Sequence, residues 1–296
     1  MKVRAAQPSD ADSITQLLND HSAALHGEAD ITRTEVLEWL GDPELAIRVG
    51  EIDGRLACYG DLMLMSGGER ANLDVREHPG MPGSAAPMFD ELETIAGERG
   101  AARAWAFHSS DERELGALVR ARGYVPIRHG FRMLAGLGDS PEAPRWPDGI
   151  SVRPMHEGEE RATYDASNDA FADHWGFEPQ PYERFAHWNF GGANFDRSLN
   201  FVAMDGDDIA GLCLCSLHSS GDPTYGWVGL LGVRPPWRRR GIALALLLHS
   251  FDEFRRRGCD RVGLGVDAES TTGALELYER AGMRVQRRQD TLEKVL

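Results

Sequence analysis

The sequence predicts an α/β fold built twice, with a mixed β-sheet flanked by helices in each half of the chain. Strand-like and helical segments alternate along the C-terminal half, and hairpin signals stand early in both halves. The same order of elements recurs in the N-terminal half, and 296 residues leave room for two ordinary domains. We therefore expect two tandem α/β domains.

The elements of the C-terminal half follow from its hydrophobic periodicity. We expect, in order, a strand at 150–153, helices at 157–171 and 181–188, strands at 199–205, 208–217 and 225–234, a helix at 241–257, a strand at 260–266, a helix at 272–281 and two closing strands. The 241–257 helix is the clearest, because Leu244, Leu247, Leu248, Phe251 and Phe254 recur at helical spacing.

The N-terminal half repeats this plan at a nearly constant offset. The matching pairs are the hairpin turns Asp53-Gly54 and Asp205-Gly206, the helix starts Gly83-Ser84-Ala85 and Gly241-Ile242-Ala243, and the later glycines Gly123 and Gly282. The segment 136–149 is rich in Gly, Pro and Asp, as linkers are. We expect domains at 1–135 and 150–296, joined by a linker at 136–149.

The composition narrows the possible partners. A formal net charge of −15 opposes binding to nucleic acid and to anionic membranes. No apolar run approaches about 20 residues and no secretory signal is evident, so we expect a cytoplasmic protein. The four cysteines show no paired pattern, and Cys213 and Cys215 share one strand face while His218 falls on the other. We expect buried free thiols and no metal site.

The segment from Gly229 to Ala243 carries the strongest functional signal. An apolar strand ending at Val233 runs into three consecutive arginines and then into a helix at Gly241. The unpaired N–H groups and positive dipole end of a helix start attract anions, and Gly241 leaves room for one to approach the backbone. Neither a nucleoside-triphosphate loop nor a dinucleotide glycine pattern occurs at this point. A pyrophosphate site is one interpretation, and an exposed basic turn that merely starts a core helix is the other.

The motif Arg238-x-x-Gly241-x-Ala243 resembles the coenzyme A signature of the GNAT acyltransferases. A second family element, Ala274-x-x-Leu277-Tyr278 followed by Gly282, stands at the usual separation. The resemblance covers about residues 150–296 and implies acetyl-CoA as the cofactor, with strands 225–234 and 260–266 splaying apart to admit it. The residues that it implies for coenzyme A binding are Leu231, Gly232, Val233, Arg238, Arg239, Arg240, Gly241, Ile242, Ala243, Ser270 and Ala274.

The N-terminal copy lacks the charged residues of this signature. It has Gly80, Met81 and Pro82 where the second copy has its three arginines, and Val119 where the second copy has Tyr278. We therefore expect residues 1–135 to be a degenerate GNAT-like domain that does not catalyse.

Acyl transfer from a thioester to an amine needs a proton donor for the leaving thiolate and a base for the amine. The resemblance implies Tyr278 as general acid, although its apolar helix stripe also fits a core tyrosine. Asp173 and His174 lie where the family lines its acceptor pocket and are the candidate bases, with Asp222 and Asp267 as rivals. The residues considered for substrate binding are Trp175, Trp188, Trp227 and Asp222, the tryptophans as walls that attract a cation.

Length and tandem layout are similar to those of the mycothiol synthase group of this family, with two departures. Trp227 aligns near the acidic residue of that group, and Ser270 replaces its asparagine. We expect an acetyl-CoA-dependent N-acetyltransferase acting on the primary amine of a small molecule by direct attack. The acceptor is left open among amino sugars, amino acid derivatives and antibiotics. The alternatives are a non-catalytic coenzyme A sensor or assembly protein, and an acetyltransferase of protein N-termini or lysines.

Overall fold

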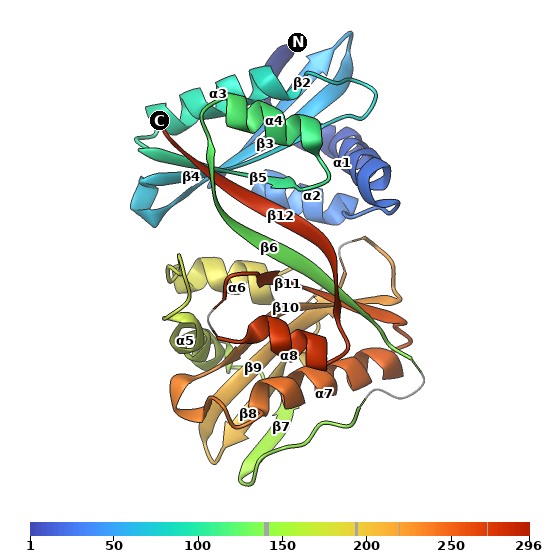
Figure 1. Cartoon of the computed structure of the whole chain (residues 1–296), viewed down its shortest axis with the longest axis vertical. Coiled ribbons are helices and arrows are strands. Elements are labelled where there is room, and N and C mark those ends of the chain that lie inside the picture. The colour runs from blue at the N-terminus through green and yellow to red at the C-terminus, as the bar shows by residue number, and fades with distance from the viewer. Residues whose placement is uncertain (139–141, 193–194, 219, 271) are drawn as a thin grey trace. The chain divides into compact units, whose positions relative to one another are not determined.

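A computed structural model describes residues 1–138, 142–192, 195–218, 220–270 and 272–296. The chain divides into two compact units, whose elements are labelled in Figure 1. Unit 1 comprises Met1–Gly130 and Arg287–Leu296, with a short stretch ending at Gly221, and unit 2 comprises Phe131–His218 and Asp222–Gln286. The two strands β6 and β12 each contribute residues to both units.

Unit 1 is a mixed sheet with helices on both faces. Its elements are β1 (Lys2–Ala5), α1 (Ala11–His26), α2 (Arg33–Gly41), β2 (Leu45–Ile52), β3 (Arg55–Met65), β4 (Arg70–Glu77), α3 (Ala85–Glu98), β5 (Arg103–Ser109), α4 (Arg113–Ala121), the first part of β6 (Val125–Gly136) and most of β12 (Arg284–Val295). The strand order runs β1-β2-β3-β4-β5-β12. Strand β12 pairs antiparallel with β5 from Gln289↔Ser109 to Val295↔Arg103, so the end of the chain belongs to unit 1.

Unit 2 repeats the plan. Its elements are the last part of β6, β7 (Ile150–Pro154), α5 (Glu160–Phe171), α6 (Tyr182–Phe190), β8 (Phe201–Asp205), β9 (Asp208–Leu217), β10 (Tyr225–Val233), α7 (Ile242–Arg256), β11 (Arg261–Asp267) and α8 (Ala274–Arg280). The strand order is β6-β11-β10-β9-β8-β7. The predicted elements are all present to within a few residues, except that the two closing strands are wrong. A single strand, β12, runs from residue 284 to 295, because no Gly, Pro or Asn interrupts that segment.

Local sequence signals account for several boundaries. Helix α2 begins with a capping box, in which the N–H of Glu35 donates to Thr32 Oγ1 and the N–H of Thr32 donates to Glu35 Oε2 at 3.0 Å. Asp53 and Gly54 both adopt positive φ, at 50° and 75°, as the tight turn between β2 and β3 requires.

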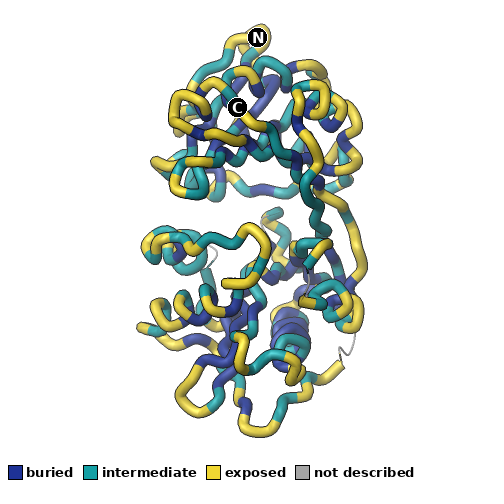
Figure 2. Tube along the Cα trace, turned by 60° about the vertical axis from the view of Figure 1, so that its left-hand side comes forward, coloured by how far each residue is buried: buried dark blue, intermediate teal, exposed yellow. Residues whose placement is uncertain are grey.

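The strands of each unit bury an apolar core on both faces. In unit 1 the helices α1 and α2 cover one face of the sheet and α3 the other. In unit 2 the helices α5 and α6 cover one face, and α7 and α8 the other. Buried positions lie inside each unit and exposed ones along its loops (Figure 2). Of the predicted linker at 136–149, residues 139–141 lie outside the described residues, and Leu137 and Trp146 contact the core of unit 2.

Candidate functional site

The predicted divergence of two strands is present in unit 2. Strand β10 pairs parallel with β11 from Tyr225↔Arg261 to Val228↔Leu264. Beyond Val228 the pairing with β11 stops, while pairing with β9 on the other side continues to Val233. The backbone edge of Leu230–Val233 that faces away from β9 is therefore left without a strand partner. Such an edge can bind an extended ligand as an added strand would.

A β-bulge marks the point of divergence, and the sequence reasoning missed it. The register of β10 against β9 shifts between Val228 and Leu230, so Gly229 is the extra residue. A glycine inside a predicted strand was the available signal, because such glycines often mark bulges.

The turn after β10 presents unpaired backbone donors. Gly241 caps α7 with φ of 89°, and Arg239 has φ of 62°, which a residue with a side chain seldom adopts. The N–H groups of residues 239–244 donate to no described residue, whereas the next one, Ala245, bonds to Gly241 O at 3.0 Å. Six consecutive free amides at the start of a 15-residue helix are donors of the kind that bind an anion. The diphosphate of coenzyme A fits this donor set.

The three arginines of the turn differ in what they contact. Arg238 is engaged by Asp173, Ala170 O and Val233 O. Arg240 lies 3.6 Å from an Asp205 carboxylate oxygen and donates to Asp148 O at 3.3 Å. Arg239 is exposed and makes no hydrogen bond or ion pair with any described residue. Arg239 is therefore the arginine with its guanidinium available to a ligand.

In unit 1 the corresponding turn is occupied by the protein's own groups. The N–H of Ala85, the first residue of α3, donates to Glu77 Oε2 at 2.9 Å, and Ser84 Oγ donates to the same oxygen at 3.2 Å. The N–H of Gly80 donates to His78 Nδ1 at 3.0 Å. A carboxylate thus stands at the helix start where an anionic ligand would bind.

The divergence between β4 and β5 in unit 1 also holds protein side chains. Parallel pairing of these strands ends at Leu73↔Ala106. Past that point His21 Nδ1 contacts Glu77 O at 2.9 Å, and His21 Nε2 lies 3.1 Å from Glu112 Oε1. Both side chains are buried. The backbone of β4 is therefore already contacted by a side chain of α1.

Tyr278 is a buried residue of α8 and is 8% exposed. Burial, with Cys213 nearby, raises the pKa of its phenol to about 12. No described residue forms a hydrogen bond with its hydroxyl group. The phenol is thus a protonated donor at every physiological pH.

Asp173 and His174 lie in the loop after α5, and their environments differ. Both carboxylate oxygens of Asp173 accept from Arg238, at 2.5 and 2.9 Å, and this contact holds the Asp173 pKa below its usual value. Partial burial lowers the pKa of His174, although Asp173 and Asp267 act in the opposite direction. His174 is therefore neutral at pH 7 and able to accept a proton, whereas Asp173 is committed to its ion pair.

The remaining predicted residues are distributed over unit 2. Trp175 is 49% exposed in the loop after α5, and Trp188 lies on α6 beside His187. Trp227 lies early in β10, where its ring contacts Tyr225 and His218.

Asp222 and the start of α8 have local structural partners. Asp222 accepts from the N–H and hydroxyl of Thr224 and from Arg261, so it stabilises the turn before β10. Ser270 precedes α8 with its hydroxyl 2.8 Å from Thr272 Oγ1, and Ala274 is the first residue of α8.

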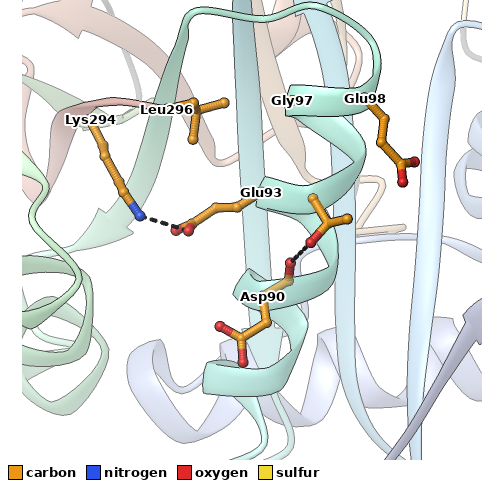
Figure 3. A pocket seen from close by; sticks show the side chains of 7 residues that line it. Asp90, Glu93, Gly97, Glu98, Lys294 and Leu296 are labelled. Carbon is orange, nitrogen blue, oxygen red and sulfur yellow. Dashed lines mark hydrogen bonds and ion pairs between the residues drawn. The ribbon is translucent and has the colours of Figure 1, made fainter.

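Other parts of the described chain offer little chemistry. An open depression of unit 1 beside α3 is lined by Asp90, Glu93, Thr94, Gly97, Glu98, Lys294 and Leu296 (Figure 3). The carboxylate of Glu93 in this depression is already paired, since Lys294 Nζ donates to it at 2.7 Å. Within the described residues no group of three or more His, Cys, Asp or Glu side chains is arranged to hold a metal ion. None of the described helices has the length and apolarity to cross a membrane.

Comparison with known proteins identifies relatives over nearly the whole chain. Residues 161–283 match the model of the acetyltransferase (GNAT) family. The chain is 33% identical to a GCN5-related N-acetyltransferase of Sphaerobacter thermophilus, with a TM-score of 0.78 over 99% of this chain and 95% of that one. It is 28% identical to a mycothiol acetyltransferase of Nocardia farcinica over 92% of this chain and 90% of that protein. A tandem GNAT protein from the clavulanic acid biosynthesis pathway shares the fold, with a TM-score of 0.79 at 16% identity over 99% of this chain and 98% of that one.

Proposed function

This chain belongs to the GNAT family of acetyltransferases, and from that premise we propose that it transfers an acetyl group from acetyl-CoA to the primary amine of a small molecule by direct attack. The observation that carries the proposal is the row of six unpaired amides at residues 239–244, beside a strand edge without a partner. Acetyl-CoA supplies the activated acetyl group.

Unit 2 supplies the binding groups in this proposal. The amides of residues 239–244 bind the diphosphate, and Arg239 and Arg240 add positive charge from the rim. The free edge of Leu231–Val233 pairs with the extended part of the ligand, and a main-chain N–H beside the bulge at Gly229 polarises the acyl oxygen. Ser270 and Ala274 border the cofactor at the start of α8.

Two side chains handle protons. Tyr278 donates a proton to the departing thiolate, and its raised pKa keeps the phenol protonated until the thiolate forms. His174 accepts the proton of the attacking amine, which its lowered pKa supports because the imidazole is neutral at pH 7. We prefer His174 to Asp173 as base, since the ion pair with Arg238 stabilises the carboxylate and weakens it as a proton acceptor.

We assign no catalysis to unit 1. Glu77 places a negative charge at the start of α3, and His21 engages the carbonyl of the β4 residue that a ligand would approach. Both contacts oppose a coenzyme A diphosphate, and they add to the loss of arginines and of the tyrosine in this half.

The acceptor amine is proposed as a class. The relative named mycothiol acetyltransferase makes the amine precursor of mycothiol a first compound to test. Trp227 and Ser270, which depart from that group, favour testing amino sugars and amino acid derivatives beside it. Peptides with free N-termini or lysines serve as the contrasting class.

A thiol-release assay with acetyl-CoA and this panel tests the proposal. We expect thiol release that depends on one small amine. Mass spectrometry should show that this amine gains about 42 Da, the mass of an acetyl group less the hydrogen that it replaces. Calorimetry should detect one coenzyme A per chain. Binding without turnover on any amine would favour the sensor alternative, and acetylation of peptides alone would overturn the small-molecule assignment.

A further inference from the structure

Arg238 joins two segments that are far apart in the sequence. Its guanidinium donates to both carboxylate oxygens of Asp173, to Ala170 O at 3.1 Å and to Val233 O at 3.1 Å. Four of its five N–H donors are thereby used. Arg238 therefore connects the end of β10 with the end of α5, rather than offering its donors to a ligand.

The end of α5 has little freedom to shift at this point. A Cβ added to Gly232 would lie 2.8 Å from Phe171 Cε2 and 2.9 Å from Ala170 Cβ, so the backbone of β10 packs directly on the last turn of α5. A side chain at position 232 would separate them.

The loop that follows α5 is built on Phe171. The N–H of His174 donates to Phe171 O at 2.9 Å, and the N–H of Phe177 donates to His174 O at 3.1 Å. The His174 ring lies 4.6 Å from the Phe171 ring. Asp173, the neighbour of His174 in this loop, pairs with Arg238, the first residue of the turn at 238–243, which we call the cofactor turn.

We propose that Asp173 is a positioning residue that clamps the loop carrying His174 to the cofactor turn through Arg238. It does not take the proton of the amine. Since residues 239–244 follow Arg238 directly, ligand binding at their amides and the position of the acceptor loop are coupled. This inference rests on the proposed function in one respect, because the loop that carries His174 is taken to line the amine-binding site.

The chain contains a matched control on the same helix. Asp169 pairs with Arg234 at 2.8 Å, and the side chains of that pair are 54% and 27% exposed, against 55% and 27% for Asp173 and Arg238. Arg234 of this pair also donates to Ile209 O at 3.2 Å and lies 5.2 Å from the centre of the Trp237 ring. Neither side chain of the pair forms a hydrogen bond or ion pair with residues 172–181 or 238–243, all of which the structure describes. Asp169→Asn therefore removes an equivalent ion pair without the proposed coupling.

The test compares Asp173→Asn, Asp173→Glu and Asp169→Asn. For Asp173→Asn we expect the amine KM to rise about 5- to 50-fold and kcat to fall by no more than about tenfold, because the loop that lines the amine site and carries His174 is less well positioned. The coenzyme A Kd should stay within about threefold. The pH profile of kcat should keep its acidic limb, Asp173→Glu should recover part of the KM, and Asp169→Asn should match the parent. A loss of kcat above about 100-fold together with that limb would make Asp173 the base and overturn the inference.

A second measurement does not require turnover. Hydrogen exchange in residues 171–181 should rise in Asp173→Asn but not in Asp169→Asn, and coenzyme A should slow it in the parent and in Asp169→Asn but not in Asp173→Asn. Unchanged exchange would refute the clamp even if the enzyme proved active. A parent protein that binds coenzyme A and acetylates nothing would refute the proposed function while leaving this exchange test intact.

Discussion

Replacing Tyr278 with phenylalanine removes one hydroxyl group and leaves the ring in place. The side chain is 8% exposed and packs in the core of unit 2, and its hydroxyl has no hydrogen-bond partner among the described residues. Because no hydrogen bond is lost, the free energy of unfolding should change by less than about 1 kcal/mol. A loss of activity that exceeds this change in stability would then come from the missing proton donor and not from unfolding.

The expected loss of activity is much larger than the loss of stability. A positioned proton donor is worth roughly 100- to 10,000-fold in rate, or about 2.7 to 5.5 kcal/mol of activation free energy. Since burial raises the pKa of Tyr278 to about 12, the phenol cannot lose its proton up to pH 9, and the parent enzyme should show no basic limb from this residue. The effect should fall on kcat and spare the coenzyme A Kd.

The assay measures thiol release at saturating amine, with the coenzyme A Kd from calorimetry and the unfolding midpoint from denaturant titration. Tyr124→Phe is the control, because Tyr124 is a buried tyrosine of unit 1 that lies outside the proposed site. An unchanged kcat in Tyr278→Phe would remove the residue from the mechanism. A Kd that rises by the same factor as kcat falls would make it a binding residue instead.

Three further changes have defined outcomes. Arg239→Glu should raise the coenzyme A Kd about tenfold at low ionic strength and much less at about 1 M salt, where the Debye length is about 3 Å. Calorimetry at both salt concentrations measures the Kd, and a change in Kd that does not depend on salt would contradict the prediction. In the pH profile of the parent enzyme, kcat/KM should decline as the pH falls through the lowered pKa of His174. In His174→Gln this acidic limb of the profile should be absent, and an acidic limb that persists would point to another base. Asp61→Asn should stabilise the protein more at pH 8 than at pH 5. Burial and the opposing Asp74 raise the pKa of Asp61 to about 7. Between about pH 4 and 7 the folded state therefore binds more protons than the unfolded state. The free energy of unfolding of the parent protein thus falls as the pH rises through this range, by at most about 4 kcal/mol. Urea unfolding at both pH values measures the difference, and equal effects would refute it.

Periodicity and turn signals predicted most of the fold correctly. The stripe of leucines and phenylalanines located α7, and Asp53-Gly54 located the first hairpin, because each depends on neighbours within a few residues. The divergence of β10 from β11 came from the family resemblance. The bulge at Gly229 depends on the register of β10 against β9, and a glycine inside a predicted strand only indicates where such a bulge can form.

The site was predictable in part, for a related reason. The amides after Arg238 follow from a helix that starts at a glycine, which is a local property. The partners of Arg238 and Asp173 are set by tertiary packing over 65 residues of sequence. The family resemblance placed Arg238 in the coenzyme A motif and Asp173 beside the acceptor pocket, but it did not predict that the two residues pair. Glu77 at the start of α3 was missed for the same reason, since a carboxylate eight residues upstream is no recognised cap.

Strands β6 and β12 each contribute residues to both units, so the order in which the ribosome makes the chain determines when each unit can be completed. Strand β5 obtains its antiparallel neighbour only from residues 289–295, and unit 2 obtains Met133 and Ala135 of its core from a strand that begins in the first half. At roughly 5–20 residues per second, the ribosome needs on the order of ten to thirty seconds between completing β6 and completing β12. Unit 1 is thus completed only after unit 2 has been made, and its exposed β5 edge must be kept from other chains until residues 289–295 emerge.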